Sequence, residues 1–157
     1  MKIESIVTIK KELQHLTKEE LLELCIRLGK FKNENKALLT YLLFQSYDEE
    51  GYIESVKSTV AEMFEEINPN SYFYMKKTIR KILKQIKIYI RYSGNKVTEI
   101  ELLLYFCECL NKLKPSIFNN TTLTNIYEQQ ISAIQKKTSA LHEDLQFDYT
   151  LRIEELT

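Results

Sequence analysis

The chain has 157 residues, and its 22 Lys and Arg against 22 Asp and Glu give a formal net charge of zero at pH 7. Only 3 Gly and 2 Pro occur, which excludes collagen-like, low-complexity and turn-rich all-β proteins. The 44% of apolar residues are typical of an ordered globular chain. This length fits a single helical domain over 1–157, with a main helical array over 1–114 and a C-terminal amphipathic helix or helical hairpin over 119–157.

Apolar residues recur at helical spacing in the first half of the chain. A short first helix is expected within 2–15. Thr17 and Glu20 form a capping box for the second helix, and Gly29 is placed to end it in a left-handed turn. Asn33 or Asn35 is expected to cap a third helix. A fourth covers 48–67, and its acidic start suits the positive end of a helix dipole.

The same spacing continues in the second half. Asn70 or Ser71 begins a fifth helix that ends at Ser93-Gly94, and a sixth runs over 96–112. Residues 102–107 are apolar on every side, so the sixth helix is expected to be the most buried. One or two further helices follow. The sequence thus predicts an all-α fold, a compact bundle of seven or eight short antiparallel helices, with a short superhelix of helical hairpins as the alternative.

The C-terminal region carries apolar residues at heptad spacing. Such a seam packs helix against helix, so we take it as a candidate surface for a protein partner or a second copy. Its members are Tyr127, Ile131, Ile134, Leu141 and Leu145.

Zero net charge hides strong blocks. Residues 48–69 carry a net charge of −6, and residues 70–97 carry +8 with no acidic side chain. The basic side chains form a stripe that could follow phosphates, and Tyr72, Tyr74, Tyr89 and Tyr92 offer rings for stacking. This candidate anion-binding or nucleic-acid-binding set is Lys76, Lys77, Arg80, Lys81, Lys84, Lys87, Arg91 and Lys96.

The neighbouring acidic block offers a simpler interpretation of the same stripe. Helix 48–67 precedes the basic helix across a tight turn, so the two are expected to pack antiparallel with complementary charges. We favour a solvated or intramolecularly compensated face over an anionic partner.

Residues with catalytic or metal-binding potential are few. Glu12 and His15 have an E-x-x-H spacing, but a di-iron bundle needs this motif twice. Cys107 and Cys109 point to different sides of a helix, and His142 has only neighbouring acids as partners. We therefore predict no catalytic residue, no metal and no cofactor, that is, a protein that is not an enzyme.

Three cysteines and no secretory signal favour reduced thiols and a cytoplasmic location. The longest apolar run has six residues, far fewer than a membrane span needs, so we expect no membrane association.

Two resemblances add to this interpretation. Residues 16–44 resemble the SAP helix-turn-helix, a nucleic-acid-binding module, through Leu16, Glu20-Leu21, Gly29, Lys36, Leu39 and Leu42. The runs KALLTYLLF, FEEIN and KIYIRYSGNK are similar to small helical proteins of unknown function from Bacteroidetes-type bacteria. The second resemblance implies a bacterial cytoplasmic protein and no mechanism.

The function expected from the sequence is a non-enzymatic protein–protein interaction or scaffold module, with an unidentified protein or a second copy as its partner. The alternative is sequence-independent nucleic-acid binding through the basic helix 70–97.

Overall fold

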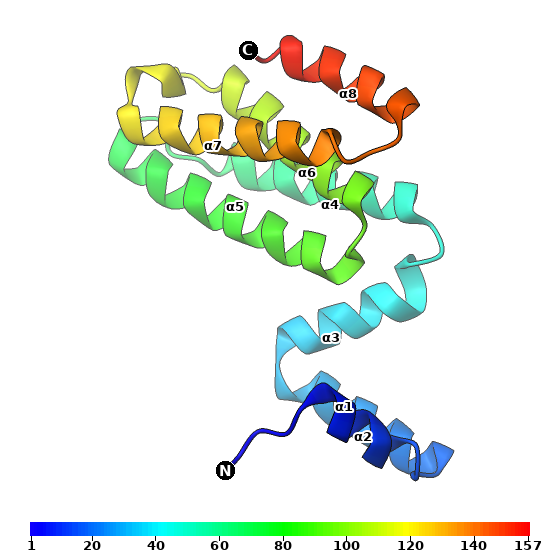
Figure 1. The fold of residues 1–157 in the computed structure, drawn as a ribbon. Coiled ribbons are helices and arrows are strands. Elements are labelled where there is room, and N and C mark those ends of the chain that lie inside the picture. The colour runs from blue at the N-terminus through cyan, green and yellow to red at the C-terminus, as the bar shows by residue number, and fades with distance from the viewer. The chain divides into compact units, whose positions relative to one another are not determined.

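Helices form most of the chain in the computed structural model, which describes all 157 residues and contains no strand (Figure 1). The α-helices are α1 (Ile6–Leu13), α2 (Lys18–Phe31), α3 (Asn33–Thr40), α4 (Glu49–Glu65), α5 (Tyr72–Ser93), α6 (Lys96–Lys112), α7 (Thr121–Thr138) and α8 (Glu143–Glu154). A π-helical turn, η1 (Tyr41–Gln45), follows α3, and a 3-10 turn, η2 (Ile117–Asn119), precedes α7. The predicted all-α fold is confirmed.

The chain divides into two compact units, residues 1–44 and residues 45–157. We call them the N-terminal unit and the bundle. This division differs from the expected single domain over 1–157 with a main array over 1–114. The bundle includes α7, which packs against α6, and α8, which packs against α7.

Most helix starts follow their local sequence. Thr17 and Glu20 form the predicted capping box, with both hydrogen bonds present. The side chains of Asp48 and Ser71 accept hydrogen bonds from the first turns of α4 and α5. These contacts satisfy backbone N–H groups that have no partner inside the helix, so the starts can be predicted from sequence.

Two predicted helix ends of the N-terminal unit are wrong. Gly29 lies inside α2, which continues to Phe31 without a left-handed residue. A Cβ at Gly29 would lie 2.9 Å from Leu39 Cδ1, so this glycine permits the close approach of α2 and α3. Neither Asn33 nor Asn35 caps α3. Lys32 occupies the cap position, and the Asn35 amide instead donates to the carbonyl of Leu28 at 2.8 Å.

The core of the bundle surrounds α6, as its wholly apolar middle predicts. This helix packs against α4, α5 and α7. Its buried side chains are Thr98, Ile100, Leu102, Leu103, Leu104, Phe106, Cys107 and Leu110. The apolar face of α5 packs inward with Met75, Ile79, Ile82, Ile86 and Ile90. Burial of this kind supplies the main stabilisation of the bundle.

The predicted C-terminal seam is not a surface. Tyr127, Ile131 and Ile134 are buried in the bundle, so they pack against the chain's own helices. Helix α7 ends at Thr138, which leaves Leu141 in the connection and Leu145 on α8. The heptad spacing therefore reports internal packing of α7, and the five residues do not form one continuous interaction seam.

No helix combines the length and the hydropathy that a bilayer crossing would require.

The end of α5 provides a test of the backbone geometry. Gly94 has φ of 66°, the left-handed conformation, and nothing lies within 4 Å of a Cβ placed there. Gly94→Ala should therefore lower the free energy of unfolding by about 1 kcal/mol through backbone strain alone. Gly94→Asn should cost less, because Asn tolerates this conformation. Chemical denaturation measures both, and an equal loss in the two variants would contradict the assignment.

Candidate functional site

The strongest concentration of charge in the bundle lies on the outer side of α5. Its seven basic side chains fall within an arc of about 140° around the helix, roughly opposite the buried isoleucines. Six of them are exposed, namely Lys77, Arg80, Lys81, Lys84, Lys87 and Arg91. Lys76 is half-buried, and Lys96 is exposed at the first position of α6. We call these eight residues the basic surface.

The cations of the basic surface have no partners within the chain. Every ion pair of the protein involves Lys57, Lys137, His142 or Arg152, and none involves the basic surface. None of the eight side chains forms a hydrogen bond either. A row of unpaired, exposed cations without interspersed acids produces a positive potential that attracts an anionic partner.

The predicted charge compensation between α4 and α5 is therefore wrong, although the two helices do pack together. What joins them is apolar packing, a hydrogen bond from the Tyr52 hydroxyl to the carbonyl of Tyr89, 2.8 Å long, and one from the Ser93 hydroxyl to the carboxylate of Glu49. The contact uses the isoleucine face of α5, and this orientation turns the lysines away from α4.

The aromatic residues around the basic surface differ in role. The hydroxyl of Tyr72 donates to the carbonyl of Ser116 at 2.8 Å, so this ring is tied to the bundle. Phe73, which the sequence analysis missed, is 67% exposed and contacts Tyr74 edge to face at 5.4 Å between ring centroids. Phe73 lies four residues before Lys77, on the same side of α5. That spacing is the signal that could have identified it.

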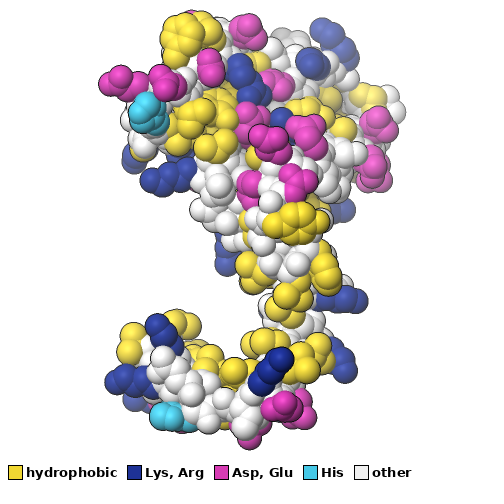
Figure 2. Space-filling view, turned by 90° about the vertical axis from the view of Figure 1, so that its right-hand side faces the viewer, with side chains coloured by type: hydrophobic (Ala, Val, Ile, Leu, Met, Phe, Trp, Pro, Cys, Tyr) yellow, Lys and Arg dark blue, Asp and Glu magenta, His cyan; other side chains and the backbone are white.

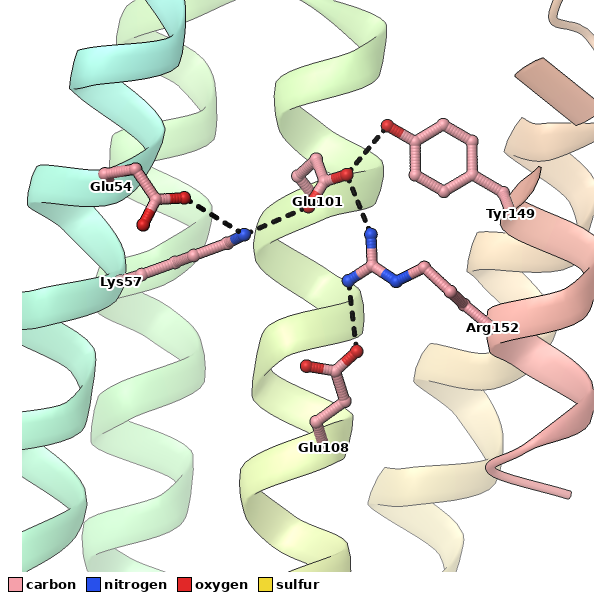
Figure 3. Close-up of polar contacts among 6 residues, drawn as sticks. All are labelled: Glu54, Lys57, Glu101, Glu108, Tyr149 and Arg152. Atoms are coloured by element: carbon pink, nitrogen blue, oxygen red, sulfur yellow. Dashed lines mark hydrogen bonds and ion pairs between the residues drawn. The ribbon is translucent and has the colours of Figure 1, made fainter. Parts of the chain in front are cut away.

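A second polar cluster joins α4, α6 and α8 (Figure 3). The carboxylate of Glu101 accepts hydrogen bonds from Lys57 at 3.1 Å, Tyr149 at 2.9 Å and Arg152 at 2.8 Å. Arg152 also reaches Glu108 at 3.0 Å. We call these residues the Glu101 cluster. No local sequence pattern indicates it, because each of these hydrogen bonds joins residues more than forty positions apart along the chain.

The electrostatics of the Glu101 cluster favour a structural role. Burial raises the pKa of Glu101, but the Tyr149 hydroxyl, Lys57 and Arg152 together hold it below its ordinary value of 4.5. Burial and the bond to Glu101 raise the pKa of Tyr149. The carboxyl group is thus ionised and the phenol protonated at neutral pH. Each group already has its partner, and the cluster fastens α8 to α6.

A cleft of about 490 Å³ lies beside this cluster and has Glu50, Glu54 and Glu101 on its walls. A second cleft, of about 320 Å³, lies between α7 and the end of α8 and includes Tyr127 and Ile131. Both are open to solvent, and neither includes a histidine or a cysteine.

The remaining titratable candidates lie apart from one another. His15 and His142 are exposed, and His142 Nδ1 accepts a long hydrogen bond of 3.4 Å from the N–H of Asp144 at the start of α8. Burial raises the pKa of Cys107 to about 12, which makes its thiol a packing group. No three His, Cys, Asp or Glu side chains gather closely enough to hold a metal ion.

Comparison with models of protein families, with curated proteins and with solved structures finds no match. The resemblances of residues 16–44 to SAP modules and of the longer chain to Bacteroidetes-type proteins therefore remain predictions.

The Glu101 cluster generates a prediction about pH. Because folding lowers the pKa of Glu101, the stability it contributes is complete above its ordinary value of 4.5 and is lost as the pH falls through the lower folded value. Glu101→Gln should destabilise the protein by about 1–3 kcal/mol at pH 7. The difference from the wild type should shrink below about pH 4.

Urea denaturation at several pH values measures this difference. Glu54→Gln is the matched control, because this carboxylate lies 3.5 Å from the same Lys57 but is 74% exposed. Its effect should stay within about 0.5 kcal/mol. A Glu101→Gln difference that does not change with pH would contradict the role assigned to Glu101.

Proposed function

We propose that this protein is a non-enzymatic binding protein whose basic surface on α5 takes a nucleic acid through its phosphates, without sequence preference. The observation that carries the proposal is the absence of any intramolecular partner for the eight cations. Unpaired lysines and arginines release counterions from a phosphate backbone when they bind it, and this release is the main source of non-specific affinity.

The dimensions of α5 support this partner. Lys76 and Arg91 are fifteen positions apart, so the row of cations extends over about 22 Å along the helix. Duplex DNA presents a negative charge about every 1.7 Å along its axis, and several phosphates therefore fit this row. Exposed Phe73 at one end of the row adds a ring on which an unpaired base can stack.

The proposal includes no catalytic residue, metal or cofactor, and it places the protein in the cytoplasm with reduced cysteines. All three cysteines are free thiols, as that compartment favours.

Charge reversal tests the basic surface. The variant Lys77→Glu, Lys84→Glu, Arg91→Glu should weaken binding of a fluorescent oligonucleotide at least tenfold at about 50 mM salt. The slope of log affinity against log salt should lose about one unit for each phosphate contact removed. Fluorescence anisotropy with single-stranded and duplex probes of the same length measures both quantities.

The matched control reverses Lys112, Lys114 and Lys136, which are exposed and lie outside α5. This variant carries the same net charge, so its affinity should stay within about threefold of the wild type if local contacts dominate. Equal losses in the two variants, or no binding by the wild type at low salt, would overturn the proposal.

A protein-interaction or scaffold function is the second candidate, and the exposed apolar side chains of the N-terminal unit favour it. Ile6, Leu22 and Phe31 are each more than half exposed. Exposed apolar surface in excess is typical of protein-binding sites.

Affinity capture separates the two functions. The baits are the wild type and the α5 charge-reversal variant, and each is used with lysates that have and have not been treated with nuclease. A specific protein that both baits capture after nuclease treatment would support the second candidate. Capture that requires intact nucleic acid and an unmodified α5 would support the first.

A further inference from the structure

The N-terminal unit has almost no core of its own. None of the residues of α1, α2 and α3 is buried, and Tyr41 is the one buried residue in 1–44. Figure 2 shows hydrophobic side chains open to solvent on this unit. Chains of about 40 residues rarely fold without a disulfide, a metal or an oligomeric partner. Its helices therefore require a surface that covers them.

Helix α2 carries the apolar surface on which a partner would pack. Leu22 is 62% exposed and Ile26 is 50% exposed, and these residues lie one turn apart on the same side of the helix. Cys25 lies between them and is also exposed. Leu28 and Phe31 are also exposed, nearer the C-terminal end of α2 and on other sides of the helix.

The charged residues beside this apolar area are arranged so that two antiparallel copies of α2 place opposite charges next to each other. Glu19 and Glu23 lie in the N-terminal half of α2, and Arg27 and Lys30 lie in the C-terminal half, all on one side of the helix. The same order suits the dipole of a single helix. Two copies of α2 that run antiparallel place Glu19 opposite Lys30 and Glu23 opposite Arg27, twice over. The centre of both pairings falls at positions 24–25.

We propose that a second copy of this chain covers the N-terminal unit, through a two-fold, antiparallel contact of α2 with α2 that has Leu22 and Ile26 at its centre. A two-fold interface uses the same patch on both copies, so the patch must complement itself. The charge order of α2 meets this condition. This inference is independent of the basic surface, which lies on the bundle.

Charge exchange on α2 tests the contact and its direction. Two double variants each place like charges opposite each other, and each should raise the dimer Kd about tenfold or more. One combines Glu19→Lys with Glu23→Lys, and the other combines Arg27→Glu with Lys30→Glu. The variant with all four substitutions reverses the order but keeps it self-complementary, so it should restore the dimer. A parallel contact predicts no such rescue, because like charges then face each other in every homodimer.

The measurement is light scattering across a range of concentrations, on protein freed of nucleic acid so that no polyanion bridges two copies. The wild type should approach twice the 18.7 kDa of the chain. Glu62→Lys with Glu65→Lys, on the exposed side of α4, is the matched control and should remain dimeric. Circular dichroism checks that each variant keeps its helices.

Two results would overturn the proposal. A wild type that stays monomeric at every concentration means that the chain itself or a different protein covers α2. A dimer that the two double substitutions do not weaken, or that the fourfold variant does not restore, means that the copies meet elsewhere. Cross-linking through the exposed Cys25 adds a positional check, since the pairing brings the two thiols within about 15 Å.

Discussion

Burial of α6 is the constraint on which the bundle depends. The middle of this helix, residues 102–107, is apolar on every side, so it is stable only when other helices cover it. Helices α4, α5 and α7 supply that cover, each with one apolar face. Each of them must keep its polar side outward as a result, and the outward side of α5 is the basic surface. The position of the unpaired cations thus follows from the needs of the core.

The two units of the chain are stabilised by different means. The bundle contains nearly all of the buried side chains, and it adds hydrogen bonds between helices, such as that from Tyr52 to Tyr89. The N-terminal unit has helix caps and a close α2–α3 approach at Gly29, but almost no buried apolar area. The bundle therefore presents its charged side chains on a well-packed core, whereas the N-terminal unit exposes apolar side chains that a core of its own would bury.

Sequence patterns predict the features that depend on residues close together in the chain. Caps such as Thr17 and Asp48 act over three residues, so helix starts were accessible. The heptad spacing of Tyr127 and Ile131 does mark a buried helix face, but spacing alone does not show whether the helix that covers this face belongs to the same chain. The expected pairing of the acidic charges of α4 with the basic charges of α5 is absent, because apolar packing sets the orientation of the two helices. The Glu101 cluster joins residues as far as 51 positions apart, so no local pattern could show it.

The attachment of α8 has a consequence for how the bundle opens. This helix buries only Tyr149 and Ile153, and polar contacts to Glu101 supply much of the rest of its attachment. Its local free energy of opening therefore falls below that of α6, and its amide hydrogens exchange with solvent before those of α6. Opening would uncover Tyr127, whose hydroxyl bonds to Leu156, together with Ile131.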